Sequence, residues 1–120
     1  MHELGIAQSV IDAVQAEVAQ RDGARPVKVG LRIGEMSAID PEALRFSFDA
    51  LTRETVLEGL ALEIEVCPRR HRCGDCGTEF VVKDFVFACP QCDSTRNDCI
   101  SGEELELAYL ELEEHEPSTA

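Results

Sequence analysis

Residues 27–34, Val-Lys-Val-Gly-Leu-Arg-Ile-Gly, decide the fold because an apolar side chain stands at every second position. This alternation places one face of a β-strand against a core and leaves the other face in water. The apolar face, made by Val27, Val29, Leu31 and Ile33, therefore predicts a half-buried strand. The rest of the chain has to supply the layer that covers this face.

Two stretches with helical periodicity flank this strand. Residues 4–20 carry apolar side chains at helical spacing, which predicts an amphipathic helix. A second helix is predicted over residues 41–56, because Asp40-Pro41-Glu42 is a strong helix-start signal. Asp40 can accept from the first free backbone N–H groups, and Pro41 needs no N–H at the first helical position.

Two further strands are expected, over residues 60–66 and 105–109, where apolar and polar side chains alternate again. The order strand, helix, strand implies a crossover connection, with the first two strands parallel. The alternation shifts by one residue at Leu110 and Leu112, which marks either a bulge or the exit of the third strand.

All six cysteines lie between the second and third expected strands. Two Cys-x-x-Cys knuckles, separated by twelve residues, can direct four thiolates at one ion, and they are formed by Cys73, Cys76, Cys89 and Cys92. Four thiolates leave no position for water, which favours structural Zn(II). Two disulfides are the alternative, which a reducing compartment disfavours.

The segment between the knuckles predicts the hairpin of a zinc ribbon, because aromatic and aliphatic side chains flank Lys83-Asp84. The predicted fold class is therefore α+β: a small three-stranded sheet with two helices on one face, plus an inserted zinc-ribbon module. Residues 1–66 and 103–113 are assigned to the α+β domain, 67–102 to the zinc ribbon and 114–120 to a frayed tail.

Four further ligand-type residues are interpreted as structural. Cys67 and Cys99 are expected to be small buried hydrophobes, with a disulfide or a soft-metal site as the alternative if the second and third strands are neighbours. His71 is expected to be a solvent-facing loop histidine, and His115 a solvated residue of the acidic tail.

The first three residues, Met1-His2-Glu3, offer a metal chelate that no interior segment can form. A free α-amino group, the His2 amide nitrogen and the His2 imidazole can bind one cation in a plane, which suits Ni(II) or Cu(II). The bulky His2 predicts that Met1 is retained. A histidine that follows methionine by chance is the competing interpretation.

The formal net charge of -13 opposes binding to nucleic acid and favours a cationic metal or a basic protein surface as partner. No apolar run approaches the ~20 residues of a membrane span, and no signal peptide is visible, so a cytoplasmic protein is expected. An enzyme is not indicated, because no nucleophile–base set, phosphate loop or open zinc site is seen.

Several motifs together resemble one family. They are Met1-His2-Glu3-Leu4, the stretch Gly-Leu-Arg-Ile-Gly-Glu-Met-Ser-Ala-Ile-Asp at 30–40, the segment Phe-Ser-Phe-Asp-Ala-Leu at 46–51, and the paired knuckles. In this order they resemble the HypA/HybF family of hydrogenase maturation nickel-insertion proteins. The match runs over most of the chain.

The resemblance implies that nickel is bound by the Met1 amine, the amide nitrogen and imidazole of His2, and the amide nitrogen of Glu3. Some members add an aspartate side chain, and Asp40 stands where that residue would. A helix N-cap explains Asp40 without any metal. Gly5 stands where relatives often have Ser, which leaves the nickel ligands intact.

The resemblance further implies a nickel metallochaperone with transferred Ni(II) and structural Zn(II). Its partners would be the HypB GTPase and the NiFe-hydrogenase large-subunit precursor, and some relatives also serve urease maturation proteins. Neither nucleic acid nor membrane is expected, and monomer and homodimer remain open. The alternative function is a zinc-ribbon protein-interaction adaptor with no transferable metal.

Overall fold

The computed structural model describes residues 2–113. Two sheets are present, with strand orders β2-β1-β6 and β4-β3-β5. The elements in chain order are α1 (Glu3–Ala19), β1 (Arg25–Gly34), the 3-10 helix η1 (Glu35–Ser37), α2 (Pro41–Thr52), β2 (Ala61–Cys67), β3 (Arg70–Cys73), β4 (Glu79–Val81), β5 (Asn97–Ser101) and β6 (Leu105–Glu113). This is the predicted α+β class, with both helices and all three long strands in the predicted order.

The chain divides into two compact units, each described here by itself. Unit 1 comprises residues 1–31, 39–64 and 107–120, and unit 2 comprises 32–38 and 65–106. Within residues 2–113, no helix is long and apolar enough to cross a membrane.

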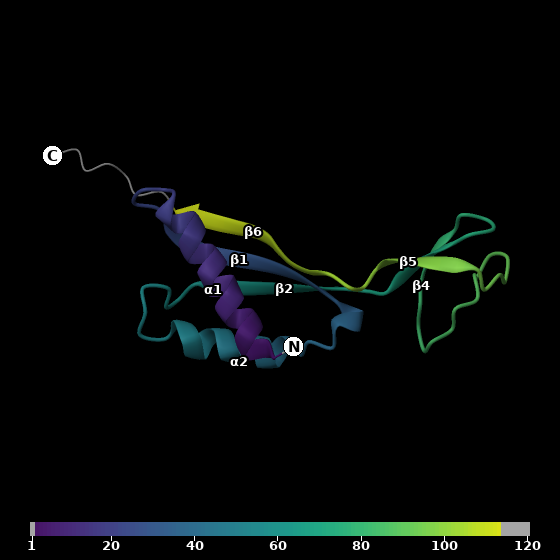
Figure 1. Ribbon diagram of the computed structural model, residues 1–120, viewed down its shortest axis with the longest axis horizontal. Helices are drawn as coiled ribbons and strands as arrows, with labels where there is room; N and C mark the ends of the chain where they lie inside the picture. The colour runs from purple at the N-terminus through teal and green to yellow at the C-terminus, as the bar shows by residue number, and fades with distance from the viewer. Residues whose placement is uncertain (1, 114–120) are drawn as a thin grey trace. The chain divides into compact units, whose positions relative to one another are not determined.

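Unit 1 packs its two helices together and against the sheet, and Figure 1 shows α1 crossing the strands β1 and β2. Phe48, Leu44 and Val14 have at most 1% of their surface exposed. The core is formed by α1, β1 and α2, with Leu57 and Leu60 from the segment before β2, as the patterns of the helices and of β1 predicted. The apolar side chains of β2 and β6 within this unit are at most half-buried. The buried apolar residues of unit 1 are Ile6, Ala7, Val10, Ile11, Val14, Val29, Leu31, Leu44, Phe48, Leu57 and Leu60.

Helix α2 ends at Thr52, four residues before the predicted end. The Thr52 hydroxyl donates to the carbonyl oxygen of Phe48, and the Thr55 hydroxyl donates to that of Thr52. Threonine side chains that bond to nearby backbone groups compete with the helix, and Glu54 then adopts a left-handed conformation with φ 62°. Val56, predicted to be helical, is 88% exposed and adds nothing to a buried face.

Strand β1 lies in the middle of its sheet, so β2 and β6 are not neighbours. Ion pairs join Lys28 to Glu63 and Arg32 to Glu65. Residue numbers therefore rise together along β1 and β2, which is the pairing expected of parallel strands.

Strand β6 changes the face that its side chains present. Arg32 pairs with Glu106, whereas a Cβ atom on Gly30 would lie 2.1 Å from Cε1 of Tyr109. Gly30 and Arg32 are two residues apart on β1, whereas their partners on β6 are three residues apart. One extra residue on one strand is the mark of a β-bulge. The strand continues to Glu113, so the shift in the sequence pattern marks this irregularity and not the strand's exit.

Unit 2 contains a second antiparallel sheet with β3 in the middle. Its hairpin is formed by β3 and β4, which carry the first knuckle between them. The hairpin predicted around Lys83-Asp84 is wrong, because β4 ends at Val81 and a tight turn follows, with Asp84 and Phe85 at φ 53° and 59°. Figure 1 shows the long loops that follow β4.

Candidate metal centre

Four thiol groups converge in unit 2. The sulfur atoms of Cys73, Cys76, Cys89 and Cys92 all lie within 4.8 Å of one another. The Sγ atoms of Cys73 and Cys92 are 3.5 Å apart, and those of Cys76 and Cys89 are 3.6 Å apart. Four sulfur atoms at such distances can surround one tetrahedral ion, so the structure brings together the four residues that the sequence selected.

The two knuckles have the same backbone hydrogen bonds. In each, the N–H of the first cysteine donates to the carbonyl five residues later, and its own carbonyl accepts from the N–H four residues later. These bonds are Cys73 to Thr78 at 2.8 Å, Gly77 to Cys73 at 3.1 Å, Cys89 to Ser94 at 2.8 Å and Asp93 to Cys89 at 2.8 Å. The chain reverses at Gly77 and Asp93, whose φ angles of 77° and 63° suit glycine and aspartate.

Backbone N–H groups also face the sulfur atoms. The Asp75 and Cys76 N–H groups donate to Cys73 Sγ at 3.4 and 3.5 Å, and the Gln91 N–H donates to Cys89 Sγ at 3.4 Å. The N–H of Cys76, followed by that of Asp75, lowers the pKa of the Cys73 thiol. The first knuckle therefore favours the thiolate form of Cys73, which is the form that binds a metal.

Different surroundings shift the pKa values of Cys76 and Cys92 in opposite directions. The hydroxyl and backbone N–H of Thr78 lower the pKa of Cys76 to about 6. The backbone N–H of Ser94 favours the thiolate of Cys92, but the neighbouring thiols, with Cys73 foremost, and burial together raise its pKa to about 12. Because a thiol must lose its proton to bind a metal, metal binding at Cys92 releases a proton.

The two remaining cysteines differ from each other. Cys67 is buried, as expected of a packed cysteine, whereas Cys99 is exposed and its thiol donates to the Ser101 carbonyl at 3.2 Å. The expectation that Cys99 is buried is therefore wrong. All six cysteines are free, and the neighbouring strands that a Cys67–Cys99 pair required are absent from the β2-β1-β6 sheet of the described chain.

His71 is a core residue of unit 2, so the prediction of a solvent-facing loop histidine is wrong. It lies in β3 and is only 5% exposed. Its Nε2 atom accepts from Arg69 Nε at 3.0 Å, and its Nδ1 atom lies 2.6 Å from Asn97 Oδ1. An amide oxygen only accepts, so the proton resides on Nδ1 and the ring is fully satisfied by Arg69 and Asn97.

At the N-terminal end of unit 1, His2 occupies the N-cap position of α1 and its side chain is exposed. The His2 imidazole makes no capping hydrogen bond. Glu3 is the first helical residue. Met1 and His115 lie outside the described residues.

Asp40 is the N-cap of α2, as the sequence predicted. Its Oδ1 atom accepts from the backbone N–H of Glu42 at 2.9 Å and of Ala43 at 3.4 Å. Both bonds end on Oδ1. The cap explains the residue by itself.

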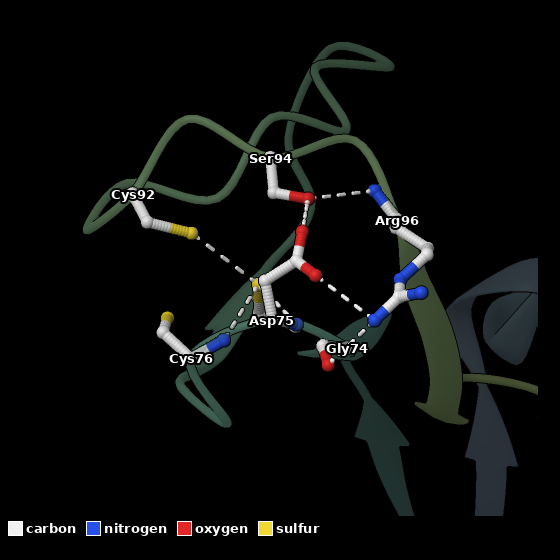
Figure 2. A network of polar contacts seen from close by, with 7 residues as sticks. Gly74, Asp75, Cys76, Cys92, Ser94 and Arg96 are labelled. Carbon is white, nitrogen blue, oxygen red and sulfur yellow. Dashed lines mark hydrogen bonds and ion pairs between the residues drawn. The ribbon is translucent and has the colours of Figure 1, made fainter.

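Sequence reasoning missed a polar network that joins the two knuckles (Figure 2). Asp75, in the first knuckle, is contacted by the Ser94 hydroxyl and by the guanidinium group of Arg96. Neither Ser94 nor Arg96 belongs to a Cys-x-x-Cys motif. A polar residue between two cysteines was the only sequence signal, and such residues are common in knuckles that make no such contact.

Together, an α+β unit of two helices on a three-stranded sheet and a ribbon with four clustered cysteines define a small metal-binding protein that carries a zinc-ribbon-like site. The model of the family described as "Hydrogenase/urease nickel incorporation, metallochaperone, hypA" matches residues 1–112. The chain belongs to this HypA family of nickel metallochaperones for hydrogenase maturation.

Known relatives cover nearly the whole chain. A hydrogenase maturation factor HypA from Geobacter metallireducens is 42% identical over 113 residues, which are 94% of this chain and 100% of the relative. The one from Nostoc punctiforme is 46% identical over 114 residues, 95% of this chain and 97% of the relative. The solution structure of the Ni metallochaperone HypA from Helicobacter pylori, 28% identical, aligns with a TM-score of 0.60 over 96% of this chain and 100% of that one.

Proposed function

We propose that this protein binds Ni(II) at a free N-terminus and delivers it during maturation of NiFe-hydrogenase, with Zn(II) held by the four clustered cysteines. The nickel ligands are the amine of Met1, the amide nitrogen and imidazole of His2, and the amide nitrogen of Glu3. The observation that carries this proposal is that the backbone N–H groups of His2 and Glu3 precede the first helical hydrogen bond of α1 among the described residues.

The first backbone hydrogen bond of α1 runs from the Ile6 N–H to the His2 carbonyl oxygen at 3.2 Å. The nitrogen atoms of His2 and Glu3 therefore lie before the hydrogen-bonded ladder. Nickel can replace the protons on these nitrogens without breaking a helical bond. The deprotonated amides also place negative charge at the positive end of the helix dipole, where it is stabilised.

The His2 side chain is equally available, because it is exposed and makes no capping bond. An imidazole that is not engaged in the fold can turn towards a metal held by the adjacent backbone. The ligand nitrogens must lose their protons to bind, so acid releases nickel.

Asp40 is proposed as a fifth nickel ligand in addition to its role as a cap. The two backbone N–H groups that it caps both bond to Oδ1. A carboxylate has a second oxygen with lone pairs of its own, so ligation through Oδ2 is compatible with the cap.

We propose Zn(II) for the cysteine cluster, because four thiolates form a closed tetrahedral set. Residues 1–66 and 103–113 then act as the nickel-binding domain and 67–102 as a structural zinc ribbon. We further propose the HypB GTPase and a NiFe-hydrogenase large-subunit precursor as partners in the cytoplasm, with a role in delivery and none in catalysis. Membership of a family of hydrogenase maturation metallochaperones supports this proposal.

The nickel proposal is tested by isothermal titration of the zinc-loaded full chain with Ni(II). We expect His2→Ala, or one residue added before Met1, to abolish tight nickel binding, because each change removes a ligand of the chelate. The fold, followed by circular dichroism, and the zinc content should not change.

Glu3→Ala is the matched control, since it removes the side chain but keeps the amide nitrogen that is proposed to bind. Its nickel affinity should equal that of the wild type. Unchanged nickel affinity in His2→Ala would contradict the N-terminal site, and loss of binding in Glu3→Ala alone would assign the ligand to the carboxylate.

A further inference from the structure

The two knuckles have little apolar packing to hold them together. The buried cluster of unit 2 consists of Cys73, Phe80, Val82 and Cys89, with Phe87 partly buried against it. Half of its fully buried members are themselves metal ligands by proposal. The distance between the knuckles must therefore depend on contacts outside this cluster.

Asp75 provides such contacts with both of its carboxylate oxygens. Its Oδ2 accepts from the Ser94 hydroxyl, and its Oδ1 lies 2.9 Å from Nη2 of Arg96 (Figure 2). Asp75 is the residue before Cys76, and Ser94 follows Cys92 by two residues. One carboxylate therefore joins the loop of the first knuckle to that of the second.

Backbone groups close the same network. Arg96 Nη2 donates to the Gly74 carbonyl at 3.2 Å, and the Gly74 N–H donates to the Arg96 carbonyl at 2.7 Å. The Arg96 N–H donates to the Ser94 hydroxyl oxygen at 3.1 Å. Ser94 thus accepts from Arg96 and donates to Asp75, which fixes the direction of its hydroxyl hydrogen.

We propose that Asp75, Ser94 and Arg96 form a clamp that holds the two knuckles at metal-binding distance and slows the escape of the metal. The proposal rests on metal binding by the four cysteines. The three residues are positioning residues, since none of them supplies a ligand atom.

The proposed clamp and a purely electrostatic effect of Asp75 predict opposite changes in metal binding when Asp75 is neutralised. Four thiolates around a divalent cation carry a net charge of about −2. A nearby carboxylate therefore disfavours the metal-loaded site, unless it also stabilises the positions of the ligands. Arg96 offsets that charge. Neutralising Asp75 should therefore tighten metal binding if only charge matters, and weaken it if the clamp matters.

Exposure limits the size of the effect. The side chains of Asp75 and Arg96 are 49% and 76% exposed, and isolated surface ion pairs contribute little. Here the pair is one part of a closed set of hydrogen bonds, so its loss frees the loop of the first knuckle. We expect metal release to accelerate about tenfold, at the lower end of the range for groups that orient metal ligands.

The experiment follows the transfer of zinc from the full chain to an excess of the chromophoric chelator 4-(2-pyridylazo)resorcinol. Asp75→Asn should release zinc about tenfold faster than the wild type. Asp93→Asn is the matched control, because it removes the same charge beside Cys92 at a residue outside the clamp. Asparagine also tolerates the left-handed backbone of that position.

Ser94→Ala is the second variant, since it breaks the bridge without any change in charge, and it should also accelerate release. In the double variant Asp75→Asn/Arg96→Gln, the second change should add little, because the clamp is already open. The cobalt(II) spectrum of every variant should keep its thiolate charge-transfer bands, since the ligands are intact.

Equal release rates in the wild type, Asp75→Asn and Ser94→Ala would overturn the clamp, as would slower release from Asp75→Asn. A wild-type protein that carries no zinc would instead refute the zinc assignment itself, and the clamp with it. The two failures are therefore distinguishable on the same samples.

Discussion

In unit 1 the helices α1 and α2 bury aliphatic and aromatic side chains such as Val14, Leu44 and Phe48 almost completely, whereas the buried apolar residues of the ribbon in unit 2 are three cysteines, Phe80 and Val82. Each large buried side chain contributes about 1.5–3 kcal/mol. We therefore expect unit 1 to fold on its apolar core, and the ribbon of unit 2 to depend on polar contacts and on a metal at the four clustered cysteines. The comparison teaches that one chain can combine a unit that is stabilised by apolar packing with a unit that is stabilised by a metal.

The largest expected effect is that of removing the metal. Chelation, or Cys73→Ser, should unfold β3, β4 and β5 and leave α1 and α2 folded, because structural zinc supplies about 10–16 kcal/mol in small zinc modules. Amide hydrogen exchange read by mass spectrometry checks this. Protection should be lost in residues 70–101 only. Simultaneous loss in residues 3–19 would show that the two units fold as one.

The opposite perturbation is a cavity in the core of unit 1. Phe48→Ala should lower the free energy of unfolding of unit 1 by about 3–5 kcal/mol, since this side chain is 1% exposed. Phe46→Ala is the control on the same helix, because Phe46 is 75% exposed and its loss should cost less than about 0.5 kcal/mol. Urea denaturation measures both changes. A fall in zinc content of folded Phe48→Ala protein would contradict the separation of the units.

A smaller effect is expected on the solvent face of the sheet in unit 1. Gly30→Ala should destabilise by about 1–3 kcal/mol, because the new Cβ would overlap the Tyr109 ring. Gly5→Ala, in α1, meets no atom within 4 Å and should stabilise by about 0.5–1 kcal/mol. The midpoint temperatures of thermal unfolding of the two variants should shift in opposite directions from that of the wild type. A stabilised Gly30→Ala protein would refute the contact between Gly30 and Tyr109.

The smallest effect is a pH dependence of unit 1. The hydrogen bond to Glu63, with burial and the charges of Glu63 and Glu111, raises the pKa of Tyr109 to about 12 from an ordinary value of 10.0. The fold favours the neutral phenol, so this contribution to stability is present below pH 10 and is lost as the pH rises from 10 to 12.

Tyr109 is the only tyrosine, and tryptophan is absent, so tyrosinate absorbance after a rapid pH jump reports this residue alone. Glu63→Gln should move the midpoint of the Tyr109 titration back towards pH 10. A titration that is the same in both proteins would show that Glu63 does not control Tyr109.

Local chemistry made much of the fold predictable. Asp40 and Pro41 marked the start of α2 because capping depends on neighbouring backbone groups. The knuckle spacing identified the cluster of four cysteines for the same reason, since each pair is made by one short turn. The helices, the three long strands and the metal cluster all followed from such local signals.

Residues whose surroundings come from distant parts of the chain were predicted poorly. His71 is buried because Arg69 and Asn97 satisfy its ring, and Asn97 is 26 residues away. The hairpin of the ribbon depended on the pairing of β3 with β4. The early end of α2 has a local cause instead, the hydrogen bonds of the Thr52 and Thr55 hydroxyls to nearby carbonyl groups.

By itself the sequence determined the periodic elements, the N-cap of α2 and the identity of the clustered thiols, because these depend on residues a few positions apart. Only the tertiary structure decided that β1 lies between β2 and β6, that His71 is a core residue, and that Asp75, Ser94 and Arg96 join the two knuckles. Such contacts close long loops, and many alternative closures differ little in local energy. The packing of the whole unit selects one of them.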